Sequence, residues 1–209
     1  FSICLYITRY IYSINDCFEN KSRMVHLTTE DPQTGEVQST SFCNFYEDLK
    51  KFPISGVETY VYIHHVEARP FNIEVSEEKV LPYTLEVMET DSAYQRVFTP
   101  EVLYGSWKQA ALTPNSILLS ESVAKRIFGQ AENAVGKQMV LTHRLHTSPK
   151  STPRTGGIAY TIQGVLEDLP PNNSLNFLQK TEAWVLNDSE GILNSHMKRA
   201  FMGGNTFAL

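Results

Sequence analysis

The stretch that decides the fold runs from Ile117 to Gly129 and reads ILLSESVAKRIFG. Its three leading apolar residues predict the end of a buried strand. We expect the Ser120 hydroxyl to accept hydrogen bonds from the first helical N–H groups, and Glu121 to suit the positive end of the helix dipole. Gly129 suits the left-handed conformation that ends a helix. The helix between them places four apolar residues on one face: Val123, Ala124, Ile127 and Phe128. A helix of about two turns is stable only when it packs on a sheet.

Two later stretches predict the elements that follow this helix. Residues 135–141 read VGKQMVL and predict a turn that leads into a strand. Residues 160–172 read YTIQGVLEDLPPN and predict a strand that ends in a rigid, proline-containing connector. We expect Lys137–Arg144 and Ala159–Leu166 to form the two arms of a hairpin, and His146–Gly157, which is rich in Ser, Thr and Pro, to form a loop between them.

The rest of the chain predicts a mixture of strands and helices. Further strands are expected from alternation and β-branched content at Arg23–Thr29, Val57–Val66, Phe71–Val75 paired with Val80–Tyr83, Glu182–Leu186 and Asn205–Leu209. Helices are expected at Ser41–Phe52, where Pro53 stops the helix, around Ser92–Phe98, and at Ile192–Phe201. Residues 31–35 predict a turn, and the remainder of 86–112 predicts loop.

Composition places the chain among ordinary globular proteins. It has 209 residues, of which 42% are hydrophobic and 20% charged, enough for one large or two small domains. The net charge of −5 argues against a nucleic-acid partner, which would require a basic surface. The cysteines Cys4, Cys17 and Cys43 show no metal-binding spacing and allow at most one disulfide, so the pairing of Cys17 with Cys43 stays open.

The first fourteen residues are apolar and aromatic, with Arg9 in their midst. They are too short and too interrupted to span a bilayer, which takes about 18 or more apolar residues. They also lack the basic start and the cleavage site of a signal peptide. Two interpretations remain, the outer end of a membrane helix or a buried amphipathic helix or strand.

Gly129–Lys137 superficially resembles a phosphate-binding loop. Six residues separate Gly129 from Gly136, however, and Gln138 occupies the place of the Ser or Thr that would bind magnesium. We interpret this stretch as a helix end followed by a turn.

The other chemistry-bearing residues favour structural roles. His64, His65 and Glu67 lie in a predicted strand, where neighbouring side chains point to opposite faces and cannot bind one metal ion together. The side chains of His143 and His146, three residues apart, also point to opposite faces of a strand. Glu167 and Asp168 are interpreted as a solvated turn, and Cys17 and Cys43 have no His or basic neighbour that would activate a thiolate. We therefore predict no catalytic, cofactor-binding or metal-binding residue.

Taken together, these stretches resemble a known family. The soluble domains of MacB/FtsX-type ABC transporter permeases, especially those common in Bacteroidetes, carry a Ser-Glu-x-x-Ala-x-x-hydrophobic-Phe-Gly helix, matched by 119–129. A Val-Gly-Lys turn follows, matched by 134–137, and then a strand ending in Asp-Leu-Pro-Pro-Asn, matched by 164–174. Residues 98–105 resemble a Phe-containing segment that closes with Gly. The resemblance is good over residues 85–178, and three motifs in the family's order make it specific.

The resemblance implies an α+β fold in which a βαβ-type porter-like subdomain holds an inserted, smaller, mainly-β subdomain. On this basis residues 1–19 would be the membrane-proximal end of the first transmembrane helix and 20–85 the first part of the porter-like subdomain. Residues 86–158 would be the inserted subdomain, and 159–209 the return to a porter-like subdomain that is incomplete at its C-terminal end.

The function implied is that of a non-catalytic periplasmic domain of an inner-membrane ABC permease, which couples ATP-driven helix motion to export or release of a substrate. Its expected partners are a cytoplasmic ATPase domain or subunit, a second copy in the full transporter, and a periplasmic adaptor. No cofactor and no nucleic acid are expected. The alternative is a free-standing secreted or surface-anchored αβ binding module, which a gene product with a cleavable signal would favour.

Overall fold

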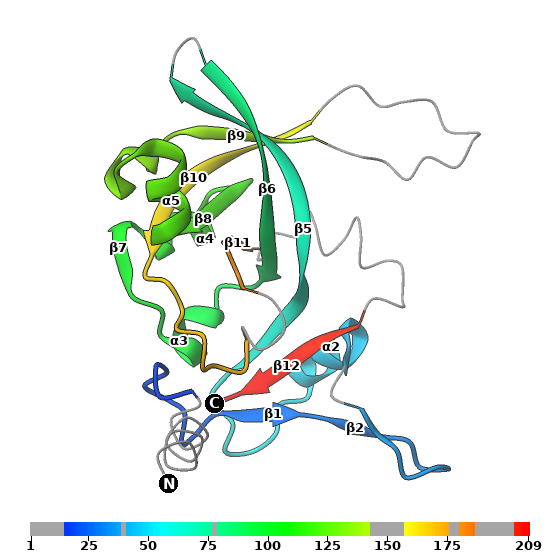
Figure 1. Cartoon of the computed structure of the whole chain (residues 1–209). Coiled ribbons are helices and arrows are strands. Elements are labelled where there is room, and N and C mark those ends of the chain that lie inside the picture. The colour runs from blue at the N-terminus through cyan, green and yellow to red at the C-terminus, as the bar shows by residue number, and fades with distance from the viewer. Residues whose placement is uncertain (1–14, 39–40, 77–78, 143–156, 176–179, 187–202) are drawn as a thin grey trace, which may run out of the picture.

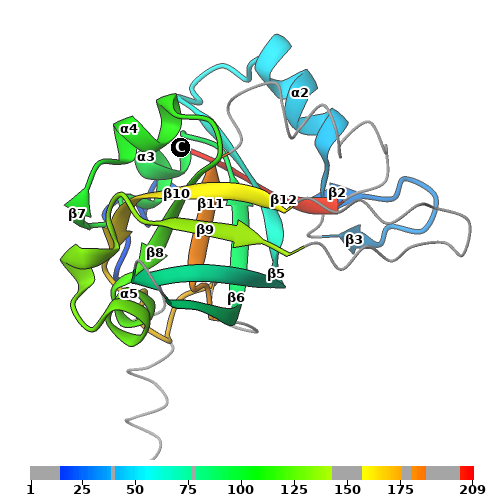
Figure 2. The ribbon, with the colours of Figure 1, turned by 90° about the horizontal axis from the view of Figure 1, so that it is seen from above.

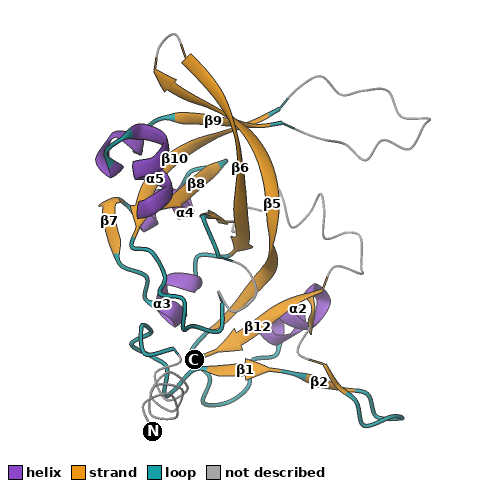
Figure 3. Cartoon of the chain, viewed as in Figure 1, coloured by secondary structure: helices purple, strands orange, loops and turns teal. Residues whose placement is uncertain are grey.

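The computed structural model describes residues 15–38, 41–76, 79–142, 157–175, 180–186 and 203–209 (Figure 1). Within these ranges the elements follow one another as β1 (Val25–Leu27), β2 (Thr29–Glu30), β3 (Val37–Gln38), β4 (Ser41–Phe42), α2 (Cys43–Lys51), β5 (Tyr60–Ser76), β6 (Lys79–Thr90), α3 (Tyr94–Phe98), β7 (Val102–Gly105), α4 (Trp107–Leu112), β8 (Ser116–Ser120), α5 (Glu121–Phe128), the 3-10 helix η1 (Ala131–Ala134), β9 (Gln138–Leu141), β10 (Ile158–Leu166), β11 (Ala183–Leu186) and β12 (Gly203–Ala208). Figure 3 shows short helices beside a dominant sheet, so the predicted α+β class is confirmed.

Six strands close into a barrel. Following the hydrogen-bonded neighbours gives the order β5, β6, β11, β8, β10, β9 and then β5 again. The closing pair is β9 with β5, in which Phe71 lies opposite Leu141 and Ile73 opposite Met139. Figure 2 looks down on this ring of strands. Two of its pairs, β8 with β10 and β6 with β11, are parallel.

The barrel is filled by alternate residues of its strands. Each of the six strands contributes two buried residues spaced two apart, as expected where one face of every strand points inward. These residues are Phe71 and Ile73, Leu85 and Val87, Ile117 and Leu119, Met139 and Leu141, Tyr160 and Ile162, and Ala183 and Val185. The apolar face of α5 and the alanines of η1 join the same cluster. The predicted docking of α5 on a sheet is therefore confirmed.

A second core lies outside the barrel wall. Residues of alternate parity on the same strands, among them Met88, Leu118 and Trp184, pack there against α3, α4 and Phe18. Strand β8 is buried over its whole length because it has apolar neighbours on both faces. This explains its continuous apolar sequence.

A third layer forms around β12, which pairs with β1, β4 and β5. Helix α2 packs on this layer through Tyr46 and Leu49, against Tyr60 and Tyr62 of β5. The hairpin β2–β3 forms a separate two-stranded sheet whose turn is closed by Asp31, which accepts from the N–H of Gln33 at 2.8 Å.

Most predicted elements are confirmed, with several differences. Ser41 and Phe42, predicted to begin a helix, form β4 instead, and the strands predicted at Val57–Val66 and Phe71–Val75 are parts of one strand, β5. Residues 99–112 were expected to be loop, but they form β7 and α4, and the Ser106 hydroxyl caps α4 by accepting from the Gln109 N–H at 3.2 Å. Residues 86–90 continue β6. The loop predicted at His146–Gly157 lies almost entirely outside the described residues, and the helix predicted at Ile192–Phe201 lies wholly outside them. The predicted division at 85/86 and 158/159 stays a prediction; the barrel draws strands from both sides of each boundary.

Candidate functional site

The N-terminus of α5 is held by a residue distant in sequence. Ser120 was predicted to cap this helix, and that prediction is wrong: its side chain accepts no hydrogen bond from a helix N–H. Instead, Oδ1 of Asp168 accepts from the Ser122 backbone N–H at 3.3 Å and from the Ser122 hydroxyl at 2.9 Å. A carboxylate is well placed at the positive end of a helix. Asp168 was interpreted as part of a solvated turn, and its half-buried contact with α5 corrects that interpretation.

Two basic residues link α5 to the strand that begins at Ala183. Lys180 donates to the Ser122 hydroxyl at 3.1 Å and lies 3.9 Å from Asp168. Arg126 forms an ion pair of 3.0 Å with Glu182. The second oxygen of Glu182 accepts the N–H of Glu86 on β6 at 3.1 Å. Helix α5 is thus connected to two barrel strands as well as to Asp168.

The segment after Asp168 forms a closed turn. Leu169 packs against the second core, and the following turn is closed by Asn173, which is 2% exposed. The Asn173 side chain donates to the carbonyl of Pro170 and accepts from the N–H of Leu175 at 2.9 Å. Two prolines restrict the backbone at the start of this turn. The rigidity predicted for this connector therefore has a second source in the buried Asn173.

The same turn binds the first described residue of the chain. The Asn15 N–H donates to the carbonyl of Asn172 at 3.1 Å, and its side-chain oxygen accepts from the N–H of Ser174 at 2.7 Å. Asn15 has φ of 66°, a left-handed conformation that Asn tolerates better than most residues. These contacts attach the start of the described chain to residues 172–174. Nothing in the sequence pattern of either segment indicates this pairing.

Aromatic side chains join the two ends of the chain. The ring of Phe98 meets Phe18 at 5.1 Å and Phe207 at 5.1 Å, both edge to face. Asn20 adds a hydrogen bond of 2.8 Å from its side chain to the carbonyl of Arg96. Helix α3 is therefore the place where residues near the start and the end of the described chain pack together.

We use the name junction for the contacts that join Asn15, residues 168–175 and the N-terminus of α5.

Residues 129–137, which superficially resemble a phosphate-binding loop, form a helix end and a turn. Gly129 ends α5 with φ of 80°, as predicted, and η1 follows. The Gly136 N–H donates to the carbonyl of Ile162 at 2.8 Å, so it serves to attach the turn to β10. Gln138 is exposed at the start of β9.

In the described part of the chain, no group of three or more His, Cys, Asp or Glu could hold a metal ion. His64, His65 and Glu67 lie on β5, but their side chains fall outside the description, as do Cys4, His143 and His146. Cys17 is an exposed free thiol.

Burial raises the pKa of two tyrosines. Burial raises the pKa of the fully buried Tyr94 far above its usual value, and it raises the pKa of Tyr160 in the barrel interior. Such shifts, which come first from desolvation, are typical of core residues.

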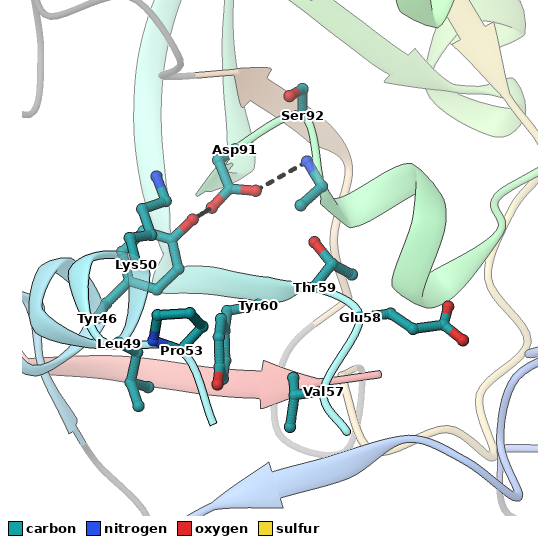
Figure 4. A pocket seen from close by; sticks show the side chains of 11 residues that line it. Tyr46, Leu49, Lys50, Pro53, Val57, Glu58, Thr59, Tyr60, Asp91 and Ser92 are labelled. Carbon is teal, nitrogen blue, oxygen red and sulfur yellow. Dashed lines mark hydrogen bonds between the residues drawn. The ribbon is translucent and has the colours of Figure 1, made fainter. Parts of the chain in front are cut away.

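A hollow of about 320 Å³ lies between the end of α2 and the start of β5 (Figure 4). At its edge the carboxylate of Asp91 accepts from the Tyr46 hydroxyl, from the Tyr62 N–H at 3.2 Å and from the Ala93 N–H at 2.9 Å. These three donors give Asp91 a structural role, joining α2, β5 and the start of α3. Asp91 was not among the predicted site residues, because two of its three donors come from α2 and β5, which are distant in sequence.

No helix within the described ranges is long and apolar enough to cross a membrane. The chain matches the family described as MacB-like periplasmic core domain over residues 5–201. No curated protein sequence matches it significantly.

Three solved structures are similar in fold. A domain of a protein described as a permease from Porphyromonas gingivalis is 20% identical, with a TM-score of 0.64, and the match covers 91% of this chain and 76% of that one. The periplasmic region of MacB from Actinobacillus actinomycetemcomitans is 14% identical with a TM-score of 0.54, covering 95% and 76%. The extracellular domain of the noncanonic ABC-type transporter YknZ from Gram-positive bacteria is 15% identical with a TM-score of 0.53, covering 90% and 83%.

Proposed function

Because this chain belongs to the family of MacB-like periplasmic core domains, we propose that it is the periplasm-facing part of an ABC-type permease and transmits movement between membrane and periplasm. The transmission is mechanical, and the chain performs no chemical step of its own. ATP would be hydrolysed by a cytoplasmic ATPase domain or subunit. Two copies would work side by side in the full transporter, with a periplasmic adaptor as a further partner.

The observation that carries this proposal is the attachment of Asn15 to residues 172–174. In the proposed transporter, the residues before Asn15 lead from the first membrane helix. A movement of that helix would reach Asn15 first, and its hydrogen bonds of 3.1 and 2.7 Å pass the displacement to the Asn172–Ser174 backbone. The segment bonded to Asn15 must be rigid, because a flexible segment would absorb the movement.

The turn that receives Asn15 supplies this stiffness. Pro170 and Pro171 restrict its backbone, and Asn173 closes it from inside. At its other end Asp168 holds the N-terminus of α5, whose apolar face belongs to the barrel core. A continuous set of short contacts therefore runs from Asn15 to the barrel. Rigid-body rocking of packed elements is an established form of conformational coupling.

The contacts of Phe98 add the segment around Phe207 to this set of contacts. Because Phe18 and Phe207 both pack on this ring, the segments near the two chain ends would move as one unit with α3. We further propose that residues 20–85 and 159–209 form a porter-like subdomain and that residues 86–158 form a subdomain inserted into it.

The test is to make the turn flexible in the full-length transporter. In the double variant Pro170→Gly with Pro171→Gly, we expect transport to fall while ATP hydrolysis continues, because glycine removes the backbone restriction. Pro32→Gly is the matched control, since Pro32 is exposed in the turn of the β2–β3 hairpin, which is a separate two-stranded sheet.

Transport and ATP hydrolysis are measured on the same membranes, with protein amount and thermal unfolding as controls for folding. If a normally folded double variant transports at the wild-type rate, the turn is no coupling element and this mechanism is wrong.

A further inference from the structure

The end of α2 and the loop after it present an unusual surface, the Lys50–Ile54 patch, which consists of residues 50–54. Phe52 is 77% exposed, more than any other large apolar side chain that the structure describes, and Ile54 is 50% exposed. Single exposed apolar residues are ordinary. Two large ones in a three-residue span, separated only by a proline, form a small protruding apolar surface.

Two exposed lysines border this apolar pair. Lys50 and Lys51 occupy the last turn of α2, and the ammonium of Lys50 lies 4.3 Å from the ring centroid of Tyr46. Cations at a helix C-terminus are favoured by the helix dipole. The patch thus combines positive charge with a protruding aromatic ring and an aliphatic side chain. This combination suits the boundary between lipid headgroups and acyl chains.

The patch continues inward into the hollow beside α2. Tyr46, Leu49, Pro53 and Tyr60 line it, and Figure 4 shows these side chains lying between the α2 helix and the start of β5. The loop is fixed here, because the Ile54 N–H donates to the Tyr60 hydroxyl at 2.8 Å. Phe52 and Ile54 are therefore held on a defined backbone.

The loop lies beside the start of the described chain. Glu58 forms an ion pair with Arg23, which follows the Asn15 junction by only a few residues. The N–H of Glu58 also donates to the carbonyl of Leu209 at 2.6 Å. In the proposed transporter the residues before Asn15 enter the membrane, so this face of the molecule is the one closest to it.

We propose that the Lys50–Ile54 patch docks on the surface of an anionic phospholipid bilayer. This inference rests on the proposed function. The lysines contact headgroup phosphates, while Phe52 and Ile54 enter the interfacial layer. The contact would hold helix α2 against the membrane, beside the segment that enters it.

The test places a tryptophan in the patch. Phe52→Trp is prepared in the full 209-residue chain and mixed with phosphatidylglycerol vesicles whose acyl chains are brominated, since bromine quenches tryptophan only at close range. The native Trp107 and Trp184 are buried, and the emission of the unmodified chain is subtracted. The matched control is Val37→Trp, because Val37 is 62% exposed on the β2–β3 hairpin.

We expect the added emission of Phe52→Trp to be quenched and that of Val37→Trp to be unaffected. Changing Lys50 and Lys51 to Gln should weaken the quenching, since each lysine near an anionic surface contributes roughly fivefold in affinity. Vesicles of phosphatidylcholine should give weaker quenching than phosphatidylglycerol.

Three outcomes would overturn the proposal. The chain could bind vesicles through its first residues while Phe52→Trp stays unquenched, which would leave the proposed function standing. The emission of Phe52→Trp could shift to the blue with rising protein concentration and no lipid, showing that a second copy covers the patch. The same shift in the full-length protein without lipid would show that its own chain covers it.

Discussion

Oδ1 of Asp168 lies 2.9 Å from the hydroxyl of Ser122, and the two residues are 46 positions apart. Asp168 belongs to the Asp-Leu-Pro-Pro-Asn connector, and Ser122 to the first turn of α5. The hydrogen bond therefore joins two of the three motifs by which the sequence resembles its family. It attaches the start of α5 to the connector that follows β10.

Removal of this carboxylate should destabilise the protein. In Asp168→Ala the Ser122 N–H loses its acceptor, and loss of a helix cap costs about 1 kcal/mol of unfolding free energy. Ser120→Ala should cost less, because the Ser120 side chain caps no helix N–H. Both are measured by denaturant unfolding, with the exposed neighbour Glu167→Ala as control. Equal losses for Asp168→Ala and Ser120→Ala would contradict the assignment of the cap.

Two glycines with nearly the same backbone angle should respond differently to alanine. Gly129 and Gly105 have φ of 80° and 79°, which residues with a Cβ rarely adopt, so both substitutions carry a backbone penalty of about 1–3 kcal/mol. A Cβ at Gly129 meets nothing within 4 Å, whereas one at Gly105 would lie 2.2 Å from the carbonyl oxygen of Gln163. We expect Gly105→Ala to be clearly the more destabilising, since β7 must move away from β10. Similar unfolding free energies would show that β7 does not approach β10 this closely.

The apolar face of α5 offers a graded pair of core substitutions. Ile127 is buried and Phe128 only partly so, although the sequence predicted burial of both. Ile127→Ala should therefore cost about 2–5 kcal/mol, and Phe128→Ala about 2 kcal/mol instead of the larger loss usual for a fully buried Phe. Denaturant unfolding of both variants measures the difference. A larger loss for Phe128→Ala would mean that the helix is rotated relative to the barrel.

Stability should fall in alkali because of Tyr94. Burial raises the pKa of its hydroxyl in the folded protein above the ordinary value of 10.0. The unfolded chain therefore releases this proton first, so the stabilisation present below about pH 10 is lost as the pH rises above it. We expect the unfolding free energy to fall less steeply above about pH 10 in Tyr94→Phe than in the natural chain. Parallel pH dependences in chemical denaturation would contradict the effect.

The chain should neither bind nor hydrolyse ATP. The backbone N–H of Gly136, which a phosphate loop would direct at the nucleotide, already donates to Ile162. Gln138 also cannot supply the hydroxyl that binds magnesium. Isothermal titration calorimetry with magnesium and ATP should give no heat of binding. Affinity in the micromolar range would reject this prediction.

Much of the fold was predictable because its signals are local. The period of the apolar residues defines α5, and the conformational freedom of Gly129 defines its end. The two arms of the β9–β10 hairpin and the end of α2 before Pro53 follow from alternation and from proline geometry. In the junction, Leu169–Pro171 was predicted to be a rigid connector for the same reason, since proline restricts its own residue.

What the sequence could not determine is which distant segments meet. The amino acids alone predict strands, a helix and a stiff turn, because those depend on neighbours within a few positions. Closure of the barrel depends on Phe71 lying opposite Leu141, and the junction depends on Asn15 reaching Asn172. Such contacts form only when the whole core packs. Ser120 was a plausible cap by local rules, but packing brings the stronger acceptor, the carboxylate of Asp168, to the helix from another part of the chain.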